Sequence, residues 1–268
     1  IADLQKLNPN YTITRDNVAA GSFIISKAAV TITAANAKMT YSGEGYDDSS
    51  LTATTSPLPA QGASLHYTLS TNGATEASTT GYPITVTASA TDNPNYAITV
   101  KSGTLIINQK QGLSIGVTGT DKTYDGQAAQ YTLNLPDGVQ QPSDWSAADY
   151  SLAAPVNAGT YTVTLSAKGI QDLQAANSNY DIQDAKETSS TFTISQAPVT
   201  ITAADAEMTY SGEGYDDSSL TATTSPLPAQ GASLHYTLST NGATEASTTG
   251  YPITVTASAT DNPNYAIT

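Results

Sequence analysis

The densest run of polar side chains in this chain is Gly43-Glu44-Gly45-Tyr46-Asp47-Asp48, which recurs at Gly212–Asp217. A tyrosine ring can stack on the face of a sugar, and neighbouring carboxylates can accept hydrogen bonds from its hydroxyls. The spacing does not match the alternating acidic ligands and distant Glu of a calcium loop. A flexible acidic turn is the alternative. The candidate ligand-contact residues are Tyr46, Asp47, Asp48, Tyr215, Asp216 and Asp217.

Trp145 is the single tryptophan and lies in the polar stretch Gln141–Ser146. An exposed tryptophan there would be a candidate anchor for a glycan or a protein partner. The alternative is a ring that covers one end of a small core. The chain has 16 Tyr but only two Phe, so we expect several tyrosines to fill cores.

The histidines offer little catalytic chemistry. His66 and His235 occupy the same position in two copies of one sequence, and His66 alternates with Leu65 and Tyr67 as a solvent-facing strand residue would. With no cysteine and no second histidine nearby, we expect no metal site. Paired carboxylates for hydrolysis lack a basic partner cluster, and a nucleophile–His–Asp arrangement would have to use His66. We therefore expect no enzyme activity and no cofactor.

The elements that position these residues are predicted to be strands. Apolar and polar residues alternate with a period of two at Val30–Ala34, Leu65–Leu69, Ile84–Ala88 and Tyr161–Leu165. Gly- and Asn-containing turn signals separate these runs. The pattern predicts a mainly β chain built from several small cores.

The charge balance excludes some partners. The formal net charge is −14, from 9 Lys and Arg against 23 Asp and Glu. Nucleic acids and anionic membranes bind through Lys and Arg, so both are poor partners for this chain. No apolar run approaches the roughly 20 residues of a membrane span.

The chain contains a long internal repeat. Residues 28–99 match residues 197–268 at an offset of 169, with differences only at positions 29, 36 and 38 and their counterparts. Within the repeat, two related modules alternate, because Met39–Gly43 resembles Lys122–Gly126 and Asn93–Ile98 resembles Asn177–Ile182. We expect a partial B module at 1–27, an A module at 28–110, a B module at 111–196 and a second A module at 197–268. Arrays of such modules usually act by reach and multivalency.

The B module is expected to contain one short helix. It has seven more residues than A between Val163 and Asn177, enough for about two α-turns. Apolar residues three apart place the helix at about 168–176. We expect an elongated tandem array of small β domains, β-grasp-like in B and all-β in A, as a reduced grasp or an Ig-like sandwich.

The second A module is expected to lack its last strand. It ends at Thr268, before the segment equivalent to Val100–Gln109, which the pattern predicts to be the closing strand. A missing strand leaves an unpaired edge that can pair with another chain. We nevertheless expect a monomeric, elongated chain, taken from the interior of a longer protein.

The repeated motifs resemble a known family. Val-Thr-Ile-Thr-Ala, Met-Thr-Tyr-Ser-Gly, Asn-Pro-Asn-Tyr-Ala-Ile-Thr and Gly-Thr-Leu-Ile-Ile-Asn in A, with Lys-Thr-Tyr-Asp-Gly and Asn-Ser-Asn-Tyr in B, are similar to the MBG-type and YDG-type repeats of bacterial surface adhesins. Mucus-binding adhesins of lactobacilli, which are Gram-positive, are the most similar members. The resemblance covers essentially the whole chain.

The resemblance implies a wall-anchored, extracellular fibre whose repeats bind mucin glycoproteins or host epithelial surfaces. It assigns no individual binding residue. The alternative is a passive stalk that presents a binding domain located elsewhere, with stiff junctions at Lys27–Ala29 and Gln196–Pro198. Binding by weak sites in series would gain avidity of about 10²–10⁴-fold.

Overall fold

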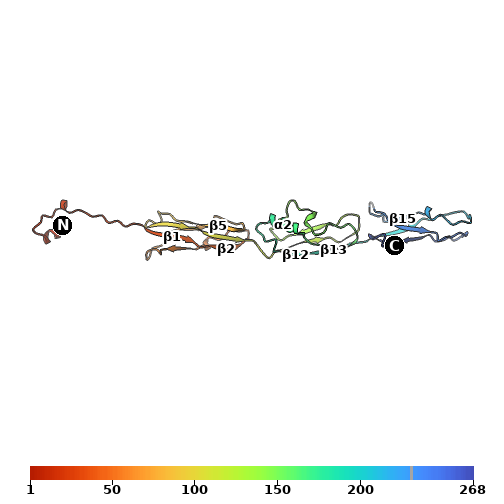
Figure 1. The fold of residues 1–268 in the computed structure, drawn as a ribbon, viewed down its shortest axis with the longest axis horizontal. Coiled ribbons are helices and arrows are strands. Elements are labelled where there is room, and N and C mark those ends of the chain that lie inside the picture. The colour runs from red at the N-terminus through yellow and green to blue at the C-terminus, as the bar shows by residue number, and fades with distance from the viewer. Residues whose placement is uncertain (230–231) are drawn as a thin grey trace. The chain divides into compact units, whose positions relative to one another are not determined.

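The computed structural model describes residues 1–229 and 232–268, and it divides into two compact units, Ile1–Asn108 and Gln109–Thr268 (Figure 1). Each unit is built from small β-sheets with little helix. Among the described residues, no helix has the length and apolar character needed to cross a membrane.

The first unit begins with a short helix, α1 (Ala2–Leu7), and a single 3₁₀ turn, η1 (Arg15–Asn17). The Gln5 side chain fastens the loop that follows the helix, because it donates to the Tyr11 carbonyl and accepts from the Ile13 amide. Residues 18–27 then run without regular secondary structure.

Seven strands and one 3₁₀ turn complete the first unit: β1 (Ala28–Ala34), β2 (Ala37–Thr40), η2 (Asp48–Ser50), β3 (Ala53–Ser56), β4 (Thr68–Ser70), β5 (Ser78–Thr87), β6 (Tyr96–Lys101) and β7 (Gly103–Asn108). They form two sheets, ordered β3-β1-β6 and β2-β7-β5-β4. In the second sheet β7 runs parallel to β2 and antiparallel to β5, so it is hydrogen-bonded on both sides.

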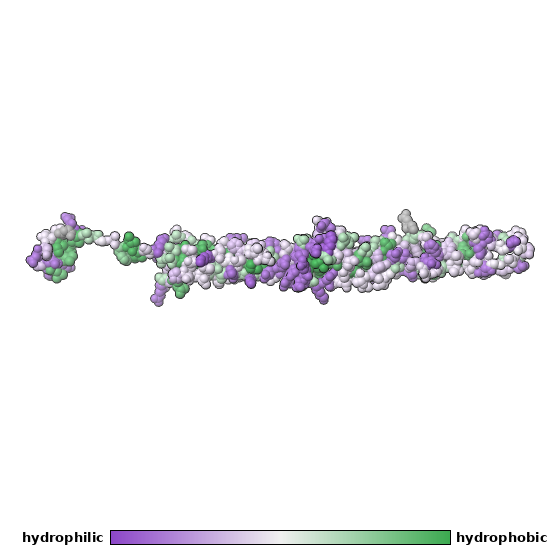
Figure 2. Space-filling model, viewed as in Figure 1, coloured by the Kyte–Doolittle hydropathy of each residue, from purple (hydrophilic) through white to green (hydrophobic). Residues whose placement is uncertain are grey.

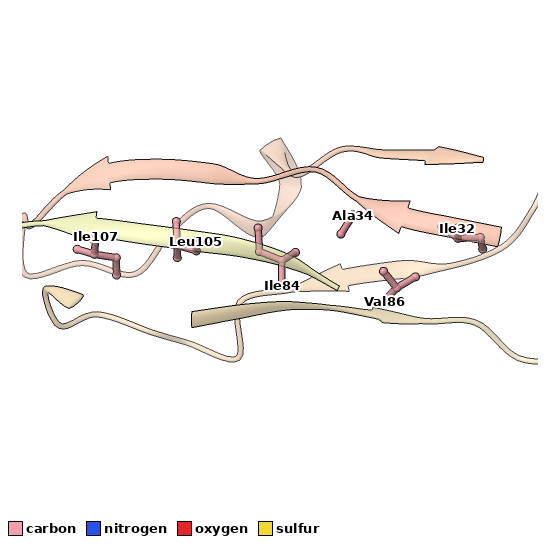
Figure 3. Close-up of a cluster of buried hydrophobic side chains, with 6 residues drawn as sticks. All are labelled: Ile32, Ala34, Ile84, Val86, Leu105 and Ile107. Carbon is pink, nitrogen blue, oxygen red and sulfur yellow. The ribbon is translucent and has the colours of Figure 1, made fainter. Parts of the chain in front are cut away.

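The core of this domain lies where the two sheets face each other (Figure 3). Alternate residues of β1, β5 and β7 point inward because successive side chains of a strand face opposite ways. Half-buried tyrosines pack around this cluster, as the shortage of phenylalanine predicts. The six buried side chains are Ile32, Ala34, Ile84, Val86, Leu105 and Ile107.

The first part of the second unit contains six strands, one α-helix and one 3₁₀ turn: β8 (Ser114–Gly119), β9 (Lys122–Thr123), β10 (Tyr131–Asn134), η3 (Ala147–Asp149), β11 (Gly159–Val163), α2 (Ala167–Ala176), β12 (Lys186–Thr188) and β13 (Ser190–Ser195). Its sheets are ordered β10-β8-β12 and β11-β13-β9. Phe192 of β13 is almost completely buried between them. The helix expected in the B module is confirmed by α2, and the Ser166 side chain caps it by accepting from the Gly169 amide.

The rest of the second unit contains β14 (Ala197–Ala203), η4 (Asp217–Ser219), β15 (Ala222–Ser225), β16 (Tyr236–Ser239), β17 (Thr254–Ala257) and β18 (Tyr265–Ile267). The sheets are β15-β14-β18 and β16-β17. The counterpart of β2, residues 206–209, is not a strand, and β17 covers only the end of the range that corresponds to β5. A strand requires a partner for its backbone groups, and none of the described residues pairs with 206–209.

The mainly β, tandem fold class predicted from the sequence is confirmed. The segment Val100–Gln109 differs in detail from the single closing strand expected, because it contains the end of β6 and all of β7. Gly103 begins β7 at a point of close approach. A Cβ atom there would lie 2.5 Å from the Ala35 carbonyl oxygen.

Candidate functional site

The loop that carries Tyr46, Asp47 and Asp48 leads into η2, and the structure uses its first carboxylate as a cap. Asp47 Oδ1 accepts hydrogen bonds from the Ser49 amide at 2.9 Å and the Ser49 hydroxyl at 2.7 Å. These bonds favour the ionised carboxylate and hold the pKa of Asp47 below its usual range. Asp47 is therefore an exposed, ionised group with one oxygen engaged at neutral pH.

Asp48 ties this loop to the end of β4. One of its oxygens accepts from the Thr71 amide at 3.0 Å and the Thr71 hydroxyl at 2.7 Å, and the other accepts from the Ser70 hydroxyl at 2.9 Å. The bonds from Thr71, followed by that from Ser70, hold the pKa of Asp48 below its usual range. This carboxylate connects two loops of its own domain, so its first role is structural.

The second copy repeats both arrangements. Asp216 accepts from the amide and hydroxyl of Ser218, and Asp217 accepts from Thr240 and Ser239 at 2.8–2.9 Å. The pKa values of both aspartates are again lowered by these hydrogen bonds. The same loop sequence therefore forms the same hydrogen bonds in both A modules.

Tyr46 and Tyr215 are half-buried, so each ring presents only part of its surface to solvent. Tyr46 packs against the buried core of its domain. The structure therefore brings each Tyr-Asp-Asp triplet together on one loop. Any contact with a ligand would use the outer edge of the ring and Asp47 or Asp216.

Trp145 lies in the B module, apart from both triplets. Its half-buried ring meets Tyr150 edge to face, with centroids 5.8 Å apart and an interplanar angle of 86°. The ring also packs over the first turn of α2, where a Cβ on Gly169 would come within 3.1 Å of it. The indole Nε1 is buried and has no hydrogen-bond partner in the described residues. This placement corresponds to a cover over a small core.

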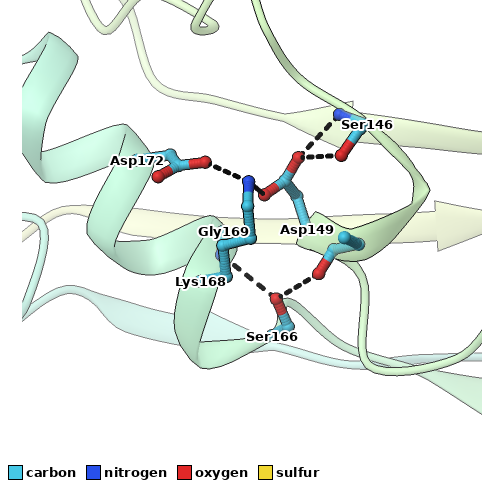
Figure 4. A network of polar contacts seen from close by, with 7 residues as sticks. Ser146, Asp149, Ser166, Lys168, Gly169 and Asp172 are labelled. Atoms are coloured by element: carbon cyan, nitrogen blue, oxygen red, sulfur yellow. Dashed lines mark hydrogen bonds and ion pairs between the residues drawn. The ribbon is translucent and has the colours of Figure 1, made fainter.

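Next to Trp145 lies a polar network that sequence reasoning did not identify (Figure 4). Asp149, with no exposed surface, accepts from the Ser146 amide at 2.6 Å and the Ser146 hydroxyl at 2.9 Å, and it pairs with Lys168 at 2.6 Å. Lys168 also pairs with Asp172 of the same helix at 2.5 Å. The network joins η3 to α2.

The two sides of this ion pair titrate in opposite directions. Burial alone would raise the pKa of Asp149, but the hydrogen bonds from Lys168 and Ser146 outweigh burial and lower it. The hydrogen bonds to Asp149 and then to Asp172 raise the pKa of Lys168 well above its usual range. The charged forms of both groups therefore persist at neutral pH.

The Asn-x-Asn-Tyr motif also has a structural role that the sequence analysis missed. The Asn93 side chain is buried and forms bonds of 2.9 Å to both the amide and the carbonyl of His66, and a third to the Ser89 carbonyl. Asn262 makes the same bonds in the second A copy, and Asn177 does the equivalent to Gln140 in B. Recurrence of the motif in every module was the signal that could have identified it.

No metal-binding arrangement is evident in the described ranges 1–229 and 232–268, where three or more His, Cys, Asp or Glu side chains are nowhere grouped to hold an ion. The side chain of His66 lies on the exposed face of the chain. The candidate ligand-contact features are therefore two copies of an exposed acidic loop and one half-buried tryptophan.

Comparison with known proteins agrees with this domain structure. The MBG domain model matches residues 112–196, and the MBG domain model of the YGX type matches residues 30–106. Together they cover more than half of the chain, and the chain belongs to the MBG-domain family. A solved structure of a cell surface adhesin from Lactobacillus reuteri is 32% identical over 31% of this chain and 93% of that chain, with a TM-score of 0.25. No curated protein matches the chain.

Proposed function

We propose that the chain is the repeat region of a bacterial surface adhesin that binds mucin glycoproteins or host epithelial surfaces through several weak contacts. The observation that carries the proposal is the near-identical repetition of the acidic Tyr-Asp-Asp loop in a chain of MBG domains. Repeating one weakly binding loop along a chain raises the overall avidity. The role is non-enzymatic and extracellular, on a protein held at the bacterial cell wall.

The contact residues of this proposal are Tyr46 and Asp47 with their counterparts Tyr215 and Asp216, together with the half-buried Trp145. Asp48 and Asp217 orient the loop by bonding to the neighbouring turn. Asp47 has an oxygen left to accept a hydrogen bond from a sugar hydroxyl.

The charge makes binding depend on pH. Mucins are anionic, and the chain has a net charge of −14, so the two repel each other at neutral pH. Protonation of carboxylates as pH falls toward about 4 reduces this repulsion. We therefore expect stronger retention on mucin at pH 4 than at pH 7, and salt should weaken that difference.

The test is retention on immobilised mucin of this chain and of a version with the 169-residue repeat doubled. A steep rise with repeat number, greater in acid, is expected. Asp47→Asn with Asp216→Asn removes two exposed charges, and Asp121→Asn with Asp205→Asn is a control of equal charge. The ligand assignment fails if the two pairs behave alike.

A passive stalk is the second candidate, and the junction inside the second unit favours it. The Gln196 side chain donates to the Pro263 carbonyl at 2.9 Å, and the Ala158 amide donates to the Asn264 side chain at 2.7 Å. Tyr124 meets Tyr265 edge to face across the same junction. Such contacts restrict bending, as a stalk needs. Absence of mucin retention for both chain lengths would favour the stalk.

A further inference from the structure

The two asparagines of the Asn-Pro-Asn-Tyr motif in the second A module have different partners. Asn262 bonds inside its own module, to the amide and the carbonyl of His235. Asn264 bonds to the B module instead. Its side-chain oxygen accepts from the Ala158 amide at 2.7 Å, and its Nδ2 donates to the Asn157 side chain at 3.1 Å. The second asparagine of the motif therefore contacts the preceding module.

The B module holds its side of this contact in place from within. The Tyr161 hydroxyl donates to the Asn157 carbonyl at 2.9 Å, and the Tyr161 ring stacks on Phe192 of the B core. The turn that carries Asn157 and Ala158 is therefore anchored to a buried side chain. A group that is held in position before it binds loses less conformational freedom when the contact forms.

Two more contacts lie at the same junction. Gln196, between β13 and β14, donates to the Pro263 carbonyl at 2.9 Å. Tyr265 meets Tyr124 edge to face, with ring centroids 5.3 Å apart, an arrangement that aromatic rings favour. Tyr124 packs against the B core, and the Tyr265 hydroxyl accepts from the Ala229 amide. The tyrosine pair thus connects the core of one module to a loop of the next.

The first copy of the motif provides an internal comparison. Both copies make the same bonds inside their own module. Asn95 is exposed and Tyr96 is half-buried, whereas their counterparts Asn264 and Tyr265 are half-buried and buried, respectively. Since the motif and its internal bonds are the same, the additional burial in the second copy comes from the B module.

The character of the surface makes these bonds important. The surface of the second unit that is visible in Figure 2 is mostly polar or neutral, with small apolar patches. Domains that meet through small or polar surfaces normally move relative to each other. A fixed junction here would depend on specific contacts between side chains that each module already holds in place.

We propose that the second asparagine and the tyrosine of the Asn-Pro-Asn-Tyr motif, Asn264 and Tyr265, are junction residues that fix the second A module to the B module, so that the two move as one rigid body. The first asparagine stabilises the fold of its own module, and the two later residues join that module to its neighbour. A fixed junction transmits force along the chain without bending. The proposal applies equally to a binding repeat and to a stalk, so it does not depend on mucin binding.

The test is nuclear magnetic resonance of the full chain in a weakly aligning medium, where residual dipolar couplings give an alignment tensor for each module. Modules that move as one body share a tensor, and we expect the B module and the second A module to do so. Asn264→Ala with Gln196→Ala should give them separate tensors, because it removes three side-chain hydrogen bonds across the junction. Asn95→Ala with Gln109→Ala is the matched control: it removes the same residue types at the equivalent earlier positions and should leave the tensor shared.

A second readout reports on the junction bond itself. The Ala158 amide donates across the junction, so its hydrogen exchange should accelerate about tenfold in Asn264→Ala and stay unchanged in Asn95→Ala. The His235 amide, which bonds to Asn262 inside the second A module, should keep its protection in both variants. That protection reports that the module remains folded.

Separate tensors in the parent chain overturn the proposal. So does a shared tensor that survives Asn264→Ala with Gln196→Ala, or a control pair that separates the modules equally. An Ala158 amide whose exchange is unchanged when Asn264 is replaced also overturns it.

Discussion

Asp149 is the position in the B module where a single substitution should have the clearest effect on stability. It has no exposed surface, and Asp149→Ala removes the acceptor for the Ser146 amide and hydroxyl and for Lys168. The substitution also removes the side-chain ion pair between η3 and the first turn of α2, while the bonds from Ser166 to the Ala148 and Asp149 carbonyls remain. We expect the domain to lose stability while its fold is retained.

The magnitude follows from the partners. Hydrogen bonds to an ionised acceptor contribute about 1.5–3 kcal/mol each. The two from Ser146 share one oxygen, and Ser146 is exposed, so its donors regain water when the carboxylate is lost. Lys168 is half exposed, so its ion pair with Asp149 is screened and adds little. We therefore expect the free energy of unfolding to fall by about 2–3 kcal/mol.

Trp145 provides the assay. It is the only tryptophan and packs beside this network, so its fluorescence reports urea unfolding of the B module alone. Asp172→Ala, which removes the outer carboxylate from Lys168, is the control and should cost less than about 0.5 kcal/mol. A loss below about 1 kcal/mol for Asp149→Ala, or equal losses for both variants, would refute the assignment.

Three further outcomes are expected. Gly81→Ala should destabilise its domain by at least about 1 kcal/mol more than Gly250→Ala does its own, because both glycines have positive φ but only Gly81 is crowded by β7. Hydrogen exchange resolved by domain would detect the difference, and equal losses would contradict the crowding at Gly81. Asn93→Ala should cost about 2–4 kcal/mol in the same measurement, because it leaves buried backbone groups at His66 and Ser89 unpaired; a change under about 1 kcal/mol would contradict that role. Since the Asp48 pKa is lowered on folding, its contribution is complete above the unfolded pKa of about 3.9 and disappears as pH falls through the lower folded value. Asp48→Asn should therefore flatten the acid side of the stability profile, and an unchanged profile would be inconsistent with the bonds seen.

Much of the fold could be predicted because its signals are local. The alternation in Val30–Ala34 reflects the period of a strand, and the seven-residue insertion before Asn177 reflects a helix. These features depend on neighbours in the sequence, and repetition made them visible several times. The boundary between β6 and β7 was missed because it depends on the close approach of Gly103 to another strand.

The roles of the candidate residues could not be read from spacing. Nothing near Asp48 in the sequence indicates Thr71, and nothing near Asp149 indicates Lys168, because each partner comes from a separate element that the fold brings close. For the same reason the sequence did not show whether Trp145 anchors a ligand or covers the end of a small core.

The amino-acid sequence by itself determined the repeat, the β character and the helix of the B module, since these follow from local periodicity and turn chemistry. Only the tertiary structure decided which carboxylates are engaged in internal hydrogen bonds. It also decided that two stretches differing only at Lys38/Glu207, Ala37–Thr40 and residues 206–209, form a strand in the first copy and none in the second. The physical reason is that a strand is stable only when its backbone groups are paired, and the partner of Ala37–Thr40, β7, lies far along the chain.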